Sequence, residues 1–171
     1  AVLCNGKMIN YANISNDAQV PTTTVQEYFQ ILRDTLVGFD VPAWKSSIKR
    51  KPVSTSKFYF FDIGIVRYLQ NRSPLRAGSP EFGDAFETYI AHELKTYTNY
   101  IGKNKLFYWR SKSGYEVDFI IDDMLAIEVK AKKNISSREL RGISALKEEN
   151  NIEKYIVVSL EKTPRQVKGI H

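Results

Sequence analysis

The sequence predicts an α/β protein built from two units, one within residues 1–72 and one within residues 80–171. In the second unit, two stretches of alternating polar and apolar residues between Gly114 and Lys130 predict a β-hairpin. A helical pattern comes before this hairpin, and a further helix and an apolar strand come after it. Since a parallel strand needs a crossover connection, this order predicts a mixed sheet flanked by a helix on each side, an α/β sandwich.

Composition narrows the classes of protein that are possible. Of the 171 residues, 43% are hydrophobic and 26% charged, which is ordinary for a globular domain, and the net charge of +6 suits a polyanionic partner such as DNA. Cys4 is the only cysteine, which excludes an intrachain disulfide. No signal peptide and no apolar run of membrane-spanning length occurs, so we expect a cytoplasmic location and no membrane partner.

The start of the chain and its lack of a phosphate-binding loop also carry expectations. The sequence opens on Ala1 rather than on a methionine, so we expect it to be a fragment of a longer protein. It contains no Gly-rich loop of the P-loop type, so we expect no ATP binding by these residues alone.

The first unit opens with two predicted helices. A brief helix at 14–20 is stopped by Pro21, and a longer helix at 25–36 follows hydroxyl residues that can cap its start. This short-helix, turn, longer-helix outline is that of a helix-turn-helix, whose second helix presents its first residues to a DNA groove. Thr22 and Thr23 are therefore candidate DNA contacts.

Two predicted strands, at 39–44 and 57–61, follow these helices and complete a winged-helix plan. The loop between them, 45–52, is polar and basic. Residues 1–72 hold nine Lys and Arg against five Asp and Glu, and the rest of the chain holds sixteen against fourteen. The loop is either a DNA-binding wing or simply a solvated loop, and the helix pair either a DNA reader or a small packing module. The candidate DNA-binding residues of the loop are Lys49, Arg50 and Lys51.

A junction and a long helix lead into the second unit. Asp62 is expected to cap a short helix that ends at Leu69, and residues 71–83 read as a linker. The spacing of apolar residues then predicts a helix over 84–100. Glu87 lies at the border of its apolar stripe, a place where a carboxylate is more often solvated or paired with a lysine than catalytic.

The remaining pattern completes the sheet. A strand at 106–111 precedes the hairpin, and a helix at 138–149 with serine caps follows it. The strand at 155–159 is almost wholly apolar, as expected of a strand buried on both faces, and is predicted to lie parallel to the second hairpin strand. Lys132, just after the hairpin, is a further candidate for phosphate contact, or it is solvated.

The hairpin brings two carboxylates together. If Ile121 lies opposite Leu125 across an odd-numbered loop, then Asp118 lies opposite Glu128, with the apolar residues of both strands on the other face. Two neighbouring carboxylates repel each other unless a cation lies between them. A divalent metal would meet this need, and Lys130 follows on the same face. The alternative is an exposed salt-bridge cluster of little energetic value.

These residues together resemble the PD-(D/E)xK nuclease superfamily, which has the restriction-endonuclease-like fold. The resemblance covers residues 80–160 and rests on Glu87 of the long helix, Asp118, and the Glu128-x-Lys130 motif ten residues later, in the same order of elements. It implies an α/β/α sandwich with a mixed sheet and Mg²⁺-dependent (or Mn²⁺-dependent) hydrolysis of DNA phosphodiesters.

A narrower resemblance covers more of the chain. The motifs Lys57-Phe-Tyr-Phe-Phe-Asp-Ile-Gly, Glu116-Val-Asp-Phe-Ile and Ile127-Glu-Val-Lys are similar to the C-terminal half of a prokaryotic AAA+-type ATPase family. In that family an ATPase domain precedes a winged helix and a PD-(D/E)xK-like domain. The resemblance implies that ATP binds only through an N-terminal ATPase domain outside this sequence, and that this domain is a partner of the present chain.

The superfamily resemblance assigns roles to individual residues. Asp118 and Glu128 would bind Mg²⁺, which accepts hard oxygen ligands, while the carbonyl of Val129 and the carboxylate of Glu87 would complete the ligand set. Lys130 would orient the attacking water and stabilise charge in the transition state. The competing hypothesis is a catalytically silent module that binds DNA or a protein and regulates the ATPase.

Overall fold

The computed structural model describes residues 1–72, 74–102, 104–149, 151–167 and 169–171. It confirms an α/β fold with two sheets, one of them mixed. In chain order the elements are η1 (Val2–Cys4), β1 (Lys7–Met8), α1 (Tyr11–Ala18), α2 (Thr22–Asp34), β2 (Gly38–Val41), β3 (Lys57–Phe60), α3 (Ile63–Leu69), α4 (Pro80–Ile101), β4 (Leu106–Arg110), β5 (Glu116–Ile121), β6 (Leu125–Lys130), α5 (Arg141–Lys147) and β7 (Lys154–Ser159).

The N-terminal part packs two helices on a three-stranded antiparallel sheet in the order β1-β3-β2. Both helices begin three residues earlier than predicted. The Asn10 side chain accepts the N–H of Asn13 at the start of α1, and α2 begins directly after Pro21, whose fixed φ suits a helix start. Phe29 and Phe58 meet edge-to-face in the core of this part, with ring centroids 5.0 Å apart.

The strand predicted at 57–61 is confirmed as β3, whereas the strand predicted at 39–44 is shorter than expected. β2 ends at Val41, and the chain then leaves its own sheet to run beside β4 of the second sheet. The amide of Trp44 donates to the carbonyl of Tyr108 over 2.7 Å, and that of Val53 donates to Arg110 over 2.9 Å. The loop expected to be either a DNA-binding wing or a solvated loop is therefore docked along the second half of the molecule.

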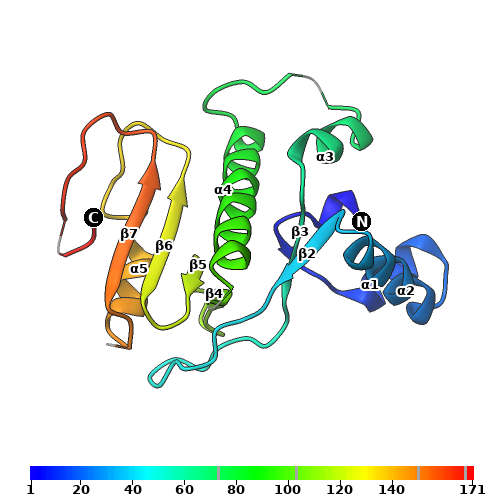
Figure 1. The fold of residues 1–171 in the computed structure, drawn as a ribbon, viewed down its shortest axis with the longest axis horizontal. Coiled ribbons are helices and arrows are strands. Elements are labelled where there is room, and N and C mark those ends of the chain that lie inside the picture. The colour runs from blue at the N-terminus through cyan, green and yellow to red at the C-terminus, as the bar shows by residue number, and fades with distance from the viewer. Residues whose placement is uncertain (73, 103, 150, 168) are drawn as a thin grey trace.

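Helix α4 is longer than predicted and lies between the two sheets (Figure 1). The Ser79 hydroxyl accepts the N–H of Phe82, and Pro80 opens the first turn, so the helix starts four residues before the expected Asp84. The linker is correspondingly shorter. Buried residues of α4, among them Ala91, pack in one cluster with Tyr59 of β3 and Phe119 of β5. The two halves thus share a hydrophobic core.

The second sheet has the order β4-β5-β6-β7, with three antiparallel strands and a parallel fourth, as predicted. The predicted hairpin register is confirmed where the ladder extends, since Phe119 pairs with Ile127 and Ile121 with Leu125 around a three-residue turn. Successive residues of β6 face opposite ways: Ala126 packs in the cluster with α5, and Ile127 in the cluster with α4. Helices therefore cover both faces of this sheet.

The prediction that side chains along β5 point alternately to the two faces of the sheet is wrong at one position. Val117 packs with Ile120 in the cluster that holds α5, and not with Phe119. The cause is a register shift in the β4–β5 ladder between Phe107 and Trp109, where β5 carries one extra residue. This irregularity lies beside Asp118.

Helix α5 is shorter than predicted, because residues 137–140 form turns before it begins at Arg141. Gly142 lies against the backbone of β5, where a Cβ atom would fall 1.9 Å from the carbonyl oxygen of Glu116. A glycine at this position therefore lets α5 approach the sheet closely. No helix in the described part of the chain is both long and apolar enough to cross a membrane.

Candidate active site at an acidic cluster between the two halves

Three of the four predicted catalytic residues meet at the β5–β6 hairpin. The Nζ atom of Lys130 lies 2.5 Å from Oε1 of Glu128 and 3.9 Å from Oδ2 of Asp118. Asp118 is 8% exposed and Glu128 5% exposed, so these are buried carboxylates and not the solvated cluster of the alternative interpretation. The lysine lies beside both of them.

Asp118 is held by the backbone of the neighbouring strand. Its Oδ2 accepts the N–H of Val129 over 2.8 Å, and this bond links β5 to β6 beyond the paired residues Phe119 and Ile127. Val129 therefore contributes its amide to the site. The carbonyl role that the resemblance implies for Val129 stays a prediction.

Glu128 has one satisfied and one unsatisfied oxygen. Its Oε1 accepts from Lys130, whereas Oε2 is buried without a hydrogen-bond partner among the described residues. A buried oxygen without a partner is costly, and such groups are often ligands of an ion or a water. Glu128 thus offers a buried oxygen that is open to an ion or a water.

Glu87 belongs to the same charged assembly but has its own partners. Its Oε1 accepts the hydroxyl of Tyr59 over 2.6 Å and lies 3.5 Å from Nζ of Lys57. The same lysine lies 2.5 Å from Oε1 of Glu116 at the start of β5. We call Glu87, Glu116, Asp118 and Glu128 the acidic cluster.

Three residues of the site, Lys57, Tyr59 and Glu116, were not predicted from the sequence. Lys57 and Tyr59 come from β3 of the N-terminal half, so the cluster is completed across the two halves. One sequence feature could have indicated two of them. Residues 57 and 59 lie on the same face of an aromatic strand, where a lysine is either at the strand end or buried beside a partner. Only the packing of β3 against α4 and β5 identifies its partners.

Burial and mutual repulsion govern the protonation of the carboxylates. Burial raises the pKa of Asp118 well above its usual range, and the charges of Glu128 and Glu87 raise it further. Burial also raises the pKa of Glu128, although Lys130 opposes this effect. The positive charge near Asp118 and Glu128 is thus too small to offset the free-energy cost of ionising both carboxyl groups.

The lysines respond in the opposite sense. Burial alone would lower the pKa of Lys57, but the charges of Glu87 and Glu116 outweigh it and raise the pKa. Burial likewise opposes ionisation of Lys130, and the neighbouring Glu128 and Asp118 raise its pKa. Both lysines are therefore cations at neutral pH.

The carboxylate oxygens of the site are ligands of the type that Mg²⁺ prefers, but too few of them, in the part of the chain that the structure describes, are arranged around one point. Asp118 and Glu128 are hard oxygen ligands on adjacent strands, and the partnerless Oε2 of Glu128 is available to an ion. However, no group of three or more His, Cys, Asp or Glu side chains in the described ranges is arranged to hold a metal ion. Glu87, the expected third ligand, is instead bound to Tyr59 and Lys57.

The predicted DNA-binding residues are dispersed over the molecule. Thr22 and Thr23 lie at the start of α2, and Thr23 is exposed. Lys51 is exposed, and Lys132 forms an ion pair with Glu139. Among the described residues, none of these four forms a hydrogen bond or ion pair with the acidic cluster, and their role in binding DNA stays a prediction.

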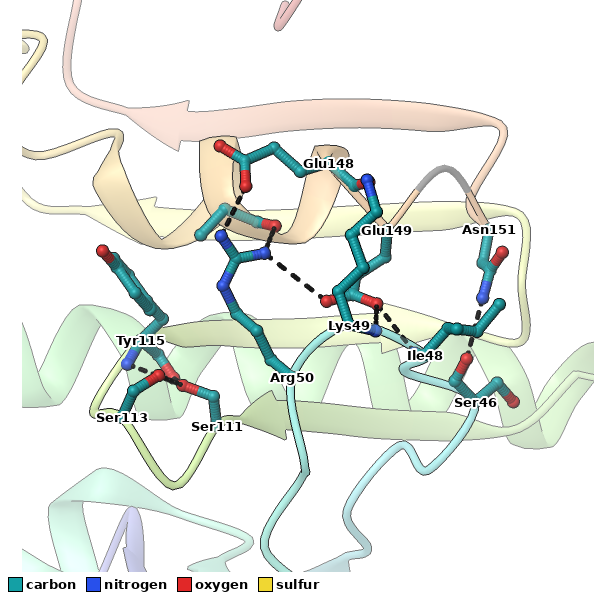
Figure 2. Close-up of polar contacts among 11 residues, drawn as sticks. Ser46, Ile48, Lys49, Arg50, Ser111, Ser113, Tyr115, Glu148, Glu149 and Asn151 are labelled. Carbon is teal, nitrogen blue, oxygen red and sulfur yellow. Dashed lines mark hydrogen bonds and ion pairs between the residues drawn. The ribbon is translucent and has the colours of Figure 1, made fainter.

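Lys49 and Arg50, also predicted to bind DNA, hold the loop 45–52 onto α5 (Figure 2). Arg50 pairs with Glu148 and Glu149 and donates to the carbonyl of Ala145 over 3.0 Å. Lys49 donates through Nζ to the carbonyl of Glu148 over 2.6 Å. We call residues 45–52 the docked loop.

Glu149 anchors the docked loop through its buried side chain. Its side chain has no exposed surface, and its Oε2 accepts the amides of Ile48 and Lys49, each over 2.7 Å (Figure 2). Although burial disfavours its charge, these backbone N–H groups lower the pKa of Glu149. The carboxylate thus fixes a basic loop by hydrogen bonds to the backbone, and not only by ion pairs.

Comparison with known proteins gives a family and distant relatives. The family model described as Domain of unknown function (DUF4143) matches residues 82–171, and one described as Domain of unknown function (DUF8612) matches residues 1–76. Uncharacterized proteins of Mycobacterium bovis and Mycobacterium tuberculosis are each 25% identical over 121 residues, covering 69% of this chain. The chain spans 26% of the length of these relatives. No solved structure matches it significantly.

Proposed function

Since this chain belongs to the DUF4143 family, we propose that it is the DNA-facing part of a longer ATPase and carries a metal-dependent, nuclease-like site. One observation carries the proposal. Two buried carboxylates on adjacent strands, Asp118 and Glu128, share the same lysine, Lys130, at 3.9 and 2.5 Å. This is the arrangement that phosphodiester hydrolysis needs, because negative charge on the phosphate must be neutralised and a water must be oriented.

The residues of the chain divide this work. Asp118 and Glu128 would hold Mg²⁺ or Mn²⁺, with Glu87 as a further ligand once its present contacts are released. When bound, the metal would supply Lewis-acid activation of the phosphate and of a water. Lys130, a compact cation on a long stem, would orient that water and stabilise charge that develops on the phosphate. Val129 keeps Asp118 in position through its amide.

The first half would present the substrate. The helices α1 and α2 and the sheet β1-β3-β2 support a winged-helix interpretation, with Thr22, Thr23 and Lys51 as phosphate contacts. Lys132, just after β6 in the second half, would add a further phosphate contact. The resemblance to an ATPase family supports an ATP-binding domain that precedes this chain, and with it a cytoplasmic location. The chain's 26% share of its relatives' length leaves room for such a domain.

A second candidate function is favoured by a separate observation. Lys57 and Tyr59 satisfy Oε1 of Glu87 without any metal. In this alternative the site is catalytically silent, and the chain binds DNA or a protein and so regulates the ATPase.

Plasmid cleavage in Mg²⁺ or Mn²⁺ tests the proposal. Using the full-length protein, we expect nicking that falls at least about 100-fold in Lys130→Ala and in Asp118→Asn. Calorimetric titration with Mg²⁺ supplies the second readout, with binding expected for the wild type and lost in Glu128→Gln. Absence of cleavage, together with metal binding that Asp118→Asn and Glu128→Gln leave unchanged, would favour the silent module.

A further inference from the structure

Lys57 is the most deeply buried cation in contact with the acidic cluster. The residue is 4% exposed, and Nζ lies 2.5 Å from Glu116 and 3.5 Å from Glu87. It also lies over the ring of Tyr108, 5.3 Å from the centroid. A lysine this deeply buried is rare unless it is paired, so its position is a built feature of the fold.

The ion pairs of the site leave little room for another cation. Four carboxylates (Glu87, Glu116, Asp118, Glu128) stand against three cations (Lys57, Arg110, Lys130), an excess of one negative charge. Adding a divalent ion would change this to an excess of one positive charge. Asp118 and Glu128 are almost fully buried, so a divalent ion bound to them is poorly screened from the ammonium groups of Lys57 and Lys130 and is repelled while both stay in place.

Glu87 is the residue for which the Lys57 ammonium and a divalent metal ion would compete. Its Oε1 contacts both the Tyr59 hydroxyl and the Lys57 ammonium, so these groups already occupy the oxygen. The backbone of Lys57 cannot withdraw, because β3 is the central strand between β1 and β2. Its flexible four-carbon side chain, by contrast, can turn from Glu87 towards Glu116.

We propose that Lys57 is the resident cation of the acidic cluster, and that a divalent metal binds there in competition with the Lys57 ammonium for Glu87. The inference rests on the proposed metal site and deepens it. The N-terminal half then sets the metal affinity of a site whose carboxylates all lie in the C-terminal half. A metal-free state held by Lys57 and a metal-bound state with Lys57 displaced are the two states of the site.

Calorimetric titration with Mn²⁺ tests this competition. Lys57→Met keeps the length of the side chain and removes its charge, so we expect Mn²⁺ to bind at least about tenfold more tightly than to the wild type. Lys57→Arg keeps the charge, and its affinity should stay near the wild-type value. Lys154→Met removes an exposed lysine from β7 and serves as the matched control.

Thermal unfolding gives a readout independent of enzymatic activity. Without metal, Lys57→Met should melt below the wild type because its carboxylates lose a counter-charge, and saturating Mn²⁺ should raise its melting temperature more than that of the wild type. If Lys57→Met fails to fold, the side-chain ammonium resonance of Lys57 in the wild type, assigned with Lys57→Arg, should shift as Mg²⁺ is added. A resonance that Mg²⁺ does not move would refute the competition.

The outcomes separate this inference from the proposed activity. Equal or weaker Mn²⁺ binding by Lys57→Met overturns the inference, even where the full-length protein cleaves DNA. Tighter binding by Lys57→Met without DNA cleavage by any variant supports the competition and refutes the nuclease activity. Lack of Mn²⁺ binding by both proteins overturns the inference as well as the metal site.

Discussion

The hydroxyl of Tyr59 donates a 2.6 Å hydrogen bond to Oε1 of Glu87 and so joins β3 of the N-terminal half to α4 of the C-terminal half. Tyr59 is fully buried, and burial together with the charge of Glu87 raises its pKa well above the usual range. The hydroxyl is therefore protonated at neutral pH and acts as the donor. The bond also fixes the carboxylate that sequence reasoning assigned to the metal.

Removal of this donor tests how strongly the bond couples the halves. Tyr59→Phe should lower the free energy of unfolding by about 2 kcal/mol, because a hydrogen bond to a charged group is lost inside the protein. Urea unfolding measures the change. Tyr97→Phe, an exposed tyrosine of α4, is the control and should change stability by less than about 0.5 kcal/mol. Equal stability of the two variants would show that the bond contributes nothing.

Two glycines give a matched test of the approach of α5 to the sheet. Gly142→Ala should destabilise the protein by about 3 kcal/mol, because its Cβ would lie 1.9 Å from the backbone oxygen of Glu116. Gly83→Ala, in α4, meets no atom within 4 Å and should stabilise by up to about 1 kcal/mol through helix propensity. Thermal and urea unfolding of both variants check the opposite signs. A tolerated Gly142→Ala would mean that α5 lies farther from β5.

The anchor of the docked loop predicts a pH dependence. The pKa of Glu149 is lowered in the folded state, so its contribution to stability is present above its ordinary value of 4.5 and is lost as the pH falls through the folded pKa. At pH 7, Glu149→Gln should cost about 1 to 3 kcal/mol, because Gln presents one neutral acceptor where a carboxylate received two amides.

Hydrogen exchange localises this effect. In Glu149→Gln the amides of Ile48 and Lys49 should lose protection, while those of the β5–β6 hairpin keep it. The difference in stability between wild type and variant should shrink as the pH is lowered below 4.5. A difference that is constant from pH 7 to pH 3 would contradict the assigned role of the charged carboxylate.

The basic residues predict two different phenotypes. Lys51→Ala with Lys132→Ala should weaken DNA binding uniformly across sequences and lower the salt slope by about 1 to 2, if both contact phosphate. Arg50→Met should instead lower stability, because Arg50 binds Glu148, Glu149 and the Ala145 carbonyl. Fluorescence anisotropy at several salt concentrations and urea unfolding separate the two. An unchanged salt slope in the double variant would remove these lysines from the DNA interface.

Local patterns were sufficient for the sheet. Alternation over Leu125 to Lys130 and the apolar run after Lys154 predicted β6, β7 and their parallel pairing, because burial of one or both faces leaves a direct trace in residue order. The hairpin register also followed from side-chain period. The exception was Val117, whose face depends on a β-bulge that no composition signal marks.

The candidate site likewise has residues that local patterns predicted and residues that only the tertiary structure brings in. Asp118, Glu128 and Lys130 were found from the sequence because they lie on two adjacent strands joined by a three-residue turn, so local register brings them together. Lys57 lies 30 residues before its partner Glu87, and no periodicity relates them. The docked loop was predicted to be either a DNA-binding wing or a solvated loop, because the sequence of a basic loop does not indicate whether water or a buried glutamate faces it.

The sequence by itself determined most of the helices and strands, the mixed sheet and a pair of carboxylates that need positive charge. The tertiary structure decided which positive charge meets the cluster, because the packing of β3 against α4 brings Lys57 and Tyr59 to Glu87. It also decided that Lys49 and Arg50 bind α5. Side-chain period governs contacts within a strand pair, whereas contacts between distant elements depend on how hydrophobic faces dock, which residue order alone does not specify.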